Sequence, residues 1–176
     1  MVIRDIQTAD LKAIHELINS AFLSNESNEI NVFVSKLLTA SVSPSIKATV
    51  AEINDEVVGF ISCSPIYVDS DESLTGYILA PLAVSPTHQQ QGIGSALVNS
   101  AINVLKENNV DVLLVYGDPD YYSRFRFMRS VADYFVPPYR LTYPAGWLGM
   151  MLSERCLPNH SVEFNCVEAL KNPDLW

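Results

Sequence analysis

No stretch of the sequence approaches the ~18 consecutive apolar residues of a membrane-spanning helix. The first ten residues, MVIRDIQTAD, carry Asp5 and Asp10 and lead into no continuous apolar core, which distinguishes them from a secretory signal. The pattern therefore predicts a cytoplasmic protein with no membrane partner.

Cysteine and positive charge are also scarce. The three cysteines, Cys63, Cys156 and Cys166, are an odd number without CxxC or Cys/His metal spacing, so we expect small, buried, reduced thiols and no metal site. The 11 Lys and Arg residues are outnumbered by 20 Asp and Glu residues, which gives a formal net charge of -9. Such a surface repels phosphate backbones and anionic lipids, and we expect no nucleic-acid partner.

Length and apolar content are sufficient for one hydrophobic core. At 176 residues and 48% hydrophobic, the chain is expected to form a single domain over residues 1–176. Strand and helix periodicities alternate without repeats, as in an α/β or α+β domain. Residues 2–7 predict a strand, and Thr8 is expected to cap a first helix with apolar positions between Leu11 and Phe22; a second helix is expected around residues 30–38.

The middle of the chain predicts a sheet. Residues 47–68 read as two strands joined at Asn54 and Asp55, and residues 75–84 as a third, so that the three form an antiparallel meander. After a helix that begins near Ile93, the apolar run VDVLLVY, residues 110–116, predicts a central, buried strand. Two more strands are expected around Met151 and Phe164, whereas the proline-rich part of this last region carries no assignable pattern.

Glycine is sparse, with seven residues, yet Gly92 and Gly94 stand together where a strand gives way to a helix. The first N–H groups of a helix lack internal partners and carry the positive end of its dipole, so an anion placed there receives several donors. Glycine lets the anion approach because it has no Cβ. The same two glycines are also compatible with a simple tight turn, and the flanking sequence has to decide between the two interpretations.

Two other phosphate-binding motifs fit poorly. A Walker loop needs Gly-Lys-Ser/Thr, whereas Gly94 is followed by Ser95 and Ala96. A dinucleotide fingerprint needs a small residue where Leu97 stands and an acidic residue that ends the next strand, whereas Asp111 precedes that strand. Dinucleotide binding remains a distant alternative.

Two segments together resemble a known family. The segment Gln89-Gln90-Gln91-Gly92-Ile93-Gly94, preceded by LAVSP, is similar to the acetyl-CoA signature Gln/Arg-x-x-Gly-x-Gly/Ala of the GNAT superfamily of N-acetyltransferases. The segment GDPDYYSRFRF, residues 117–127, resembles the GDPxYYxRFGF segment of the YhbS-like group. The resemblance extends from VIRDIQTAD to SVEFNCVEAL. It implies the GNAT fold of α/β (α+β) class, a mixed, mostly antiparallel central sheet flanked by helices, with a V-shaped opening between the two central strands.

The resemblance also implies how the co-substrate acetyl-CoA is bound. Main-chain N–H groups of the glycine loop would bind the diphosphate, and the exposed edge of the bulged strand would pair with the pantetheine amides. The N–H of Val84 would face the thioester oxygen as charge develops on it. The cofactor-binding residues implied in this way are Leu82, Ala83, Val84, Gln89, Gln90, Gln91, Gly92, Ile93, Gly94 and Ser95.

Tyr122 occupies the position of the general acid that protonates the departing CoA thiolate in such enzymes. Acetyl transfer to an amine needs a neutral nucleophile, a polarised carbonyl and a proton for the sulfur. Because the reference pKa of tyrosine, ~10, exceeds the ~8.5 of a thiol, complete proton transfer is uphill by about 2 kcal/mol. In the alternative, the phenol only hydrogen-bonds the thiolate while the ammonium supplies the proton. Packing is the competing interpretation for Tyr122 and the expected role of Tyr121.

The sequence departs from the family pattern in its charges. Arg126 stands where most relatives have glycine, so either the backbone there needs no positive φ or Arg126 has acquired another role. The glycine loop contains no Lys or Arg, and main-chain donors are expected to dominate. Arg124, Arg126 and Arg129 form the densest cationic cluster, for which solvated surface residues are the ordinary explanation.

The sequence indicates no general base. The resemblance implies that the segment with Glu26 and Glu29 forms one wall of the acceptor site. Tyr77 and Asp69 lie near the bulged strand, and surface or packing roles explain all four residues better. Deprotonation of the amine through an ordered water is the default, since an ammonium with pKa ~10.4 is mostly protonated at neutral pH. We expect direct transfer to a primary amine of a small molecule or peptide. A non-catalytic acyl-CoA-binding regulatory module is the alternative, and a homodimer stays open.

Overall fold

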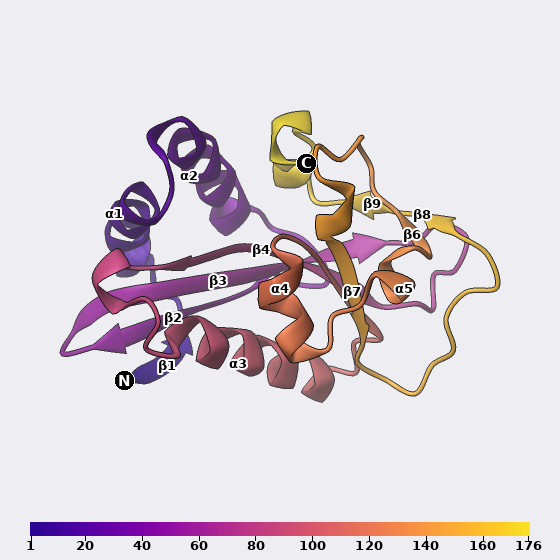
Figure 1. Ribbon diagram of the computed structural model, residues 1–176, viewed down its shortest axis with the longest axis horizontal. Coiled ribbons are helices and arrows are strands. Elements are labelled where there is room, and N and C mark those ends of the chain that lie inside the picture. Colours follow the sequence, from indigo (N-terminus) through magenta and orange to yellow (C-terminus); the bar gives the residue numbers. More distant parts are fainter.

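The computed structural model describes the backbone of residues 1–176 and every side chain except that of Asn25. A seven-stranded sheet runs through the molecule in the order β1-β2-β3-β4-β5-β7, with β9 paired to β3, and a two-stranded sheet joins β6 and β8 (Figure 1). The strands are β1 (Val2–Asp5), β2 (Lys47–Ile53), β3 (Glu56–Tyr67), β4 (Gly76–Val84), β5 (Val112–Tyr116), β6 (Phe135–Val136), β7 (Trp147–Met151), β8 (Val162–Glu163) and β9 (Asn165–Cys166).

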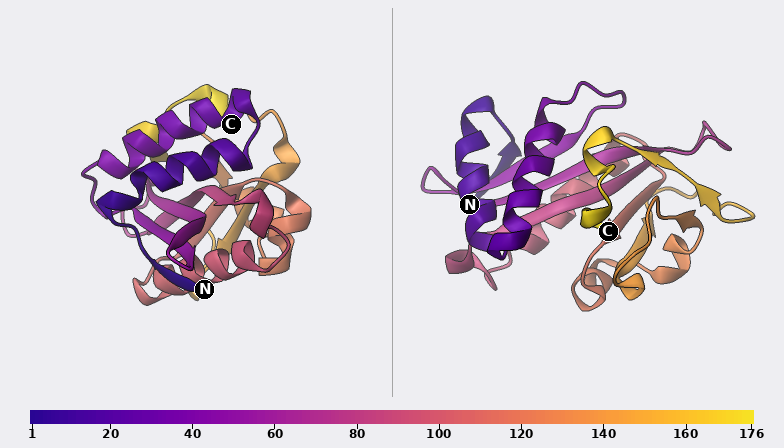
Figure 2. Two further views of the ribbon diagram at one scale, coloured as in Figure 1. Left: turned by 90° about the vertical axis from the view of Figure 1, so that its left-hand side faces the viewer. Right: turned by 90° about the horizontal axis from the view of Figure 1, so that it is seen from above.

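Helices cover both faces of the main sheet. The left view of Figure 2 shows α1 (Leu11–Ala21) and α2 (Ser24–Thr39) on one face and α3 (Ile93–Glu107) on the other. Two short helices, α4 (Pro119–Tyr122) and α5 (Arg129–Ala132), follow β5. Because side chains alternate along a strand, Phe60 and Ile61 of β3 enter separate apolar clusters on the two faces.

The predicted meander is confirmed. Strands β1 to β4 pair antiparallel in sequence order, and the turn between β2 and β3 has φ of 50° at Asn54 and 64° at Asp55. Positive φ at both central residues is the geometry of the tight hairpin turn that Asn and Asp tolerate. β5 is buried between β4, to which it is parallel, and β7, to which it is antiparallel.

The predicted cap of the first helix is wrong. Thr8 lies inside a 3-10 turn, Thr8–Asp10, that precedes α1. The N–H of Gln7 donates to the Asp10 carboxylate at 2.7 Å, and Arg4 donates to the same carboxylate at 2.7 Å. A longer-range ion pair therefore fixes this helix start, and the hydrogen bond from Arg4 holds the pKa of Asp10 below its usual value.

The thiols differ in exposure. All three cysteines are free; Cys63 and Cys166 are buried, as expected, whereas Cys156 is exposed because it lies on the surface segment after β7. Burial raises the pKa of Cys63 to about 12, which keeps this thiol protonated. Among the described residues, no three His, Cys, Asp or Glu side chains gather as a metal site would require. Within the same set, no helix has the length and apolarity to cross a membrane.

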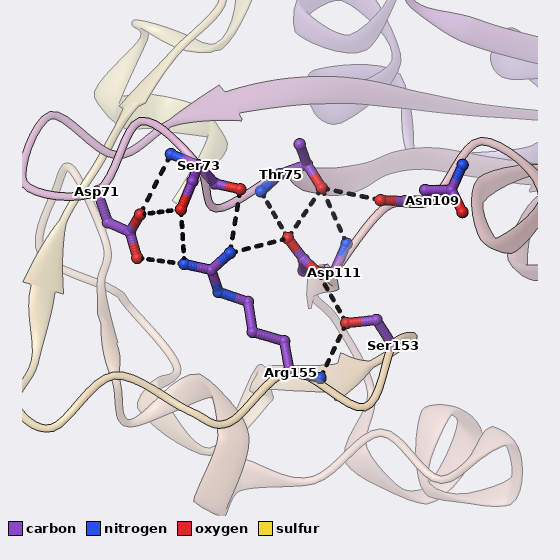
Figure 3. Close-up of polar contacts among 7 residues, drawn as sticks. All are labelled: Asp71, Ser73, Thr75, Asn109, Asp111, Ser153 and Arg155. Carbon is purple, nitrogen blue, oxygen red and sulfur yellow. Dashed lines mark hydrogen bonds and ion pairs between the residues drawn. The ribbon is translucent and has the colours of Figure 1, made fainter.

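A polar network ties the segment after β7 to the far end of the sheet (Figure 3). Arg155 pairs with Asp71 at 2.6 Å, and Asp111 accepts hydrogen bonds from the N–H of Thr75 at 2.9 Å and from Ser153 at 2.7 Å. Asp111, the acidic residue of the dinucleotide alternative, thus has a structural role at the start of β5. The mostly antiparallel sheet also differs from the parallel sheet that such a fingerprint requires.

Candidate functional site

The two central strands separate at the site. β4 and β5 are paired from Gly76 with Val112 to Leu79 with Val115. Beyond Leu79, β4 continues to Val84 against β3, while β5 continues against β7. One edge of β4 is therefore released from the sheet, and this is the predicted V-shaped opening.

A β-bulge marks the point of separation. Ile61 pairs with Leu82 and Cys63 with Leu79, so Ser62 faces the two residues Ala80 and Pro81. Proline has no N–H to donate, which suits it to a bulge. The hydroxyl of the fully buried Ser62 donates to the carbonyl of Ala80 at 2.6 Å. Ser62 thus satisfies a carbonyl of the bulge, a role that the sequence analysis missed.

Main-chain groups of alternate residues face the released edge of β4. The N–H of Ser85 donates to the carbonyl of Val58 at 2.9 Å, so in an antiparallel ladder the groups of Ser85 and Ala83 face β3. Those of Leu82 and Val84 face the opening. In agreement with this alternation, the Val84 carbonyl accepts a hydrogen bond at 3.2 Å from the side-chain amide of Gln89 instead of from a strand.

The glycine loop turns sharply into α3. Gly92 precedes the helix with φ of 83°, and Gln90 has φ of 59°. Two left-handed residues this close together curl the backbone, which lets successive N–H groups converge on one point. The loop leads directly into the positive end of a 15-residue helix, where four N–H groups lack helical partners.

A cavity of about 560 Å³ joins the glycine loop to the released edge of β4. It brings together most of the predicted cofactor residues, whereas Ala83 and Gln91 lie outside its lining. The residues that line the cavity are Leu82, Val84, His88, Gln89, Gln90, Gly92, Ile93, Gly94, Ser95, Tyr121 and Arg124.

The two glycines have different roles. A Cβ on Gly92 would meet no atom within 4 Å, so its positive φ is what requires glycine. A Cβ on Gly94 would lie 2.6 Å from the hydroxyl oxygen of Tyr121. Gly94 therefore makes room for Tyr121 in the cavity wall. Tyr121 was expected to be a packing residue, and its place in the cavity was missed.

Tyr122 packs edge to face against Tyr121, with ring centroids 5.0 Å apart, is only 8% exposed and does not line the cavity. Helix α4 begins on Asp118, whose carboxylate accepts the N–H of Asp120 at 2.9 Å, with Pro119 in the first turn. A Cβ on Gly117 would lie 2.6 Å from the Tyr122 ring, so Gly117 makes room for that ring directly after β5. Burial raises the pKa of Tyr122, and its hydroxyl stays protonated at neutral pH.

Arg126 has φ of 70°, in the left-handed region. The sequence left two explanations for an arginine at this position: a backbone that needs no positive φ, or another role for Arg126. The observed φ excludes the first. The side chains of Arg124 and Arg126 are both exposed, but only Arg124 lines the cavity. The spacing of three residues between Tyr121 and Arg124 in a helical turn is a signal that could have identified this pair.

The candidate bases are not gathered at the cavity. Tyr77 is buried and donates its hydroxyl to the Ser45 carbonyl at 2.9 Å, and burial raises its pKa to about 12. Asp69 accepts a hydrogen bond at 3.0 Å from Asn165 of β9. Glu29 lies on α2 in a separate shallow groove. These positions agree with their ordinary explanation as structural or surface groups.

Comparisons with known proteins agree with this geometry. A family model described as Acetyltransferase (GNAT) family matches residues 11–128. The chain is 36% identical over 72 residues to the uncharacterized N-acetyltransferase YhbS of Escherichia coli K12, a match that spans 41% of this chain and 42% of that protein. It is 29% identical over 149 residues to the uncharacterized N-acetyltransferase YjhQ of the same strain, which spans 82% of this chain and 81% of that protein.

Solved structures show the same fold. The crystal structure of Escherichia coli YhbS in complex with CoA has a TM-score of 0.83 at 24% identity and covers 97% of this chain and 92% of its own. A GNAT acetyltransferase from Brucella melitensis in complex with acetyl-CoA has a TM-score of 0.66 at 23% identity, with coverage of 92% and 93%. The predicted fold class is confirmed.

Proposed function

Because the chain belongs to the acetyltransferase (GNAT) family and is similar to its YhbS-like members, we propose that it is an acetyl-CoA-dependent N-acetyltransferase that transfers an acetyl group directly to a primary amine. One observation carries the proposal: the glycine loop at the start of α3 and the released edge of β4 line one cavity. Tyr122 is buried beside Gly117, directly after β5, and does not itself line that cavity. Two structural neighbours bind CoA or acetyl-CoA, which supports this choice of co-substrate.

The residues present fit acetyl-CoA. The main-chain N–H groups from Gln89 to Gly94 would hold the diphosphate, and the main-chain groups of Leu82 together with the carbonyl of Val84 would pair with the pantetheine amides. The side-chain amide of Gln89 has to release the Val84 carbonyl for this pairing. The bound co-substrate supplies the activated thioester. The N–H of Val84 would stabilise negative charge on the thioester oxygen, because it is fixed by the strand before the reaction begins.

Tyr122 would serve the sulfur. Its raised pKa widens the gap to a thiol, so complete proton transfer from the phenol is more unfavourable than reference values suggest. The buried hydroxyl is therefore better suited to donate a hydrogen bond to the departing thiolate while the ammonium formed on the acceptor supplies the proton. Either route makes the hydroxyl a transition-state donor.

The acceptor would be a small-molecule or peptide amine. The net charge of -9 favours a cationic molecule over an anionic one and disfavours nucleic acid. Since the candidate carboxylates lie outside the cavity lining, deprotonation of the ammonium through water is the simplest route. A non-catalytic acyl-CoA-binding module is the second candidate, and it is favoured by the finding that none of the candidate carboxylates lines the cavity.

Two measurements test the proposal. Calorimetry should show that acetyl-CoA binds, whereas NAD and ATP do not; tight NAD binding without a response to acetyl-CoA would contradict it. Release of free thiol from acetyl-CoA is then measured with a panel of small amines and amine-bearing peptides. Thiol release with at least one amine supports the enzyme, and binding without release for the whole panel supports the binding module.

A further inference from the structure

The cavity contains a cation that the glycine loop lacks. The guanidinium carbon of Arg124 lies 4.4 Å from the ring centroid of Tyr121, and its Nε donates to the Tyr121 carbonyl at 3.1 Å. These contacts fix the guanidinium plane and leave its terminal nitrogens available. Arg4 and Arg155 are paired with carboxylates at 2.6 Å, whereas no ion pair to Arg124 occurs among the described side chains.

The hydroxyl of Tyr121 is a second unused donor in the same wall. It is buried, and within the described part of the chain it makes no hydrogen bond of good geometry, although the side chain of Ser95, which also lines the cavity, lies close enough to lower its pKa. Leaving such a buried group unpaired is destabilising, so a ligand atom that accepts its hydrogen bond would be favoured there. The hydroxyl adjoins Gly94 in the first turn of α3, where the main-chain N–H groups are also without helical partners. Burial raises the pKa of Tyr121, so the hydroxyl remains a donor at neutral pH.

Donors of three kinds thus face one space: main-chain N–H groups, a phenol and a guanidinium. We propose that the side chains of Tyr121 and Arg124 complete the site that binds the phosphates of CoA, beside the main-chain groups of the glycine loop. This inference rests on the proposed function. Main-chain groups bring no net charge, and the protein as a whole repels anions. Arg124 therefore supplies the counter-charge, and the Tyr121 hydroxyl donates to a phosphate oxygen.

The phosphate bound by Arg124 is either the diphosphate or the 3′-phosphate of the ribose. Both offer the same chemistry, and 3′-dephospho-CoA separates them because it retains only the diphosphate. A loss of affinity in Arg124→Gln that is equal for the two ligands assigns the diphosphate. A loss confined to CoA assigns the 3′-phosphate. Both results support Arg124 as the counter-charge and differ only in which phosphate of CoA it contacts.

The test is calorimetric titration of CoA and 3′-dephospho-CoA into the wild type, Arg124→Gln, Tyr121→Phe and Arg126→Gln at low and moderate salt. Arg126→Gln is the matched control, because it removes the same charge from an equally exposed residue that does not line the cavity. Arg124 is exposed, and ion pairs of exposed groups contribute at most about 1 kcal/mol, so Arg124→Gln should weaken CoA by up to about 5-fold. It should also reduce the salt dependence of binding. The Tyr121 hydroxyl is buried and would donate to a charged phosphate oxygen, so Tyr121→Phe should weaken CoA by about 10- to 150-fold.

If Arg124→Gln and Arg126→Gln have the same affinity for CoA, the role of Arg124 is overturned. If Tyr121→Phe has the affinity of the wild type, the role of Tyr121 is overturned. A thermal melt of each variant confirms that it is folded. Failure of the wild type to bind CoA would overturn the proposed function and this proposal with it. Wild-type binding that survives both substitutions overturns this proposal alone.

Discussion

Replacement of Arg126 by glycine should stabilise the protein. Arg126 has φ of 70° and ψ of 23°, and a residue with a Cβ pays about 1–2 kcal/mol in this left-handed region. Glycine avoids that cost but loses roughly 0.5–1 kcal/mol more backbone entropy on folding. The difference is a gain of about 0.5–1 kcal/mol in the free energy of unfolding. The arginine side chain is exposed, so little contact energy is lost with it.

The assay is urea or thermal unfolding followed by circular dichroism. For a chain of this size, the gain corresponds to a rise in Tm of about 1–4 °C. Arg126→Ala keeps the Cβ and should show no such rise. Asn109→Gly is a second control, because Asn109 has φ of 55° and asparagine tolerates this region better than arginine does. The reasoning would be refuted if Arg126→Ala were stabilised while Arg126→Gly was unchanged or destabilised. The arginine side chain, and not the left-handed backbone, would then be the source of the instability.

Two further predictions concern the glycine loop and acid stability. Gly92→Val and Gly94→Val should each lower the affinity for acetyl-CoA more than Gln90→Ala does. Valine is strained at the positive φ of Gly92, and at Gly94 it would displace Tyr121. Equal affinities in a titration would show that the loop backbone is not the phosphate site. Burial alone would raise the pKa of Asp111, but hydrogen bonds, chiefly from the neighbouring loop, hold it below its usual value. Its contribution to stability is therefore present above the unfolded pKa of ~3.9 and lost as pH falls through the folded pKa. In denaturation series at pH 3–6, Asp111→Asn should lose less stability on acidification than the wild type, and parallel curves would contradict this.

Much of the fold follows from local patterns. The hairpin at Asn54 and Asp55 could be predicted because two residues that tolerate positive φ separate two β-branched runs. The glycine loop could be located because Gly92 and Gly94 lie where the two-residue period of a strand gives way to the 3.6-residue period of a helix. The same local reasoning misplaced the helix cap at Thr8, since the ion pair of Arg4 with Asp10 depends on the position of a separate strand.

Within the site, long-range packing decided what the sequence left open. Either Tyr121 or Tyr122 is suitable as a donor by residue type, and only the space above Gly94 and Gly117 assigns the cavity wall to one and the buried position to the other. Arg124 lines the cavity because its guanidinium packs on the ring of Tyr121. The distribution of charges along the sequence does not predict this contact. Pro81 inside an apolar strand was the available sign of the bulge.

The central claim is that Tyr122 donates to the leaving thiolate during acetyl transfer to an amine. It is tested most directly by steady-state thiol release from acetyl-CoA with an accepted amine, comparing the wild type with Tyr122→Phe and Tyr121→Phe. Tyr122→Phe should lower kcat by ~100- to 10,000-fold with unchanged acetyl-CoA affinity, because it removes one oxygen and keeps the ring. Tyr121→Phe should instead raise KM for acetyl-CoA. Full turnover by Tyr122→Phe, or the same kinetic change in both variants, would contradict the account.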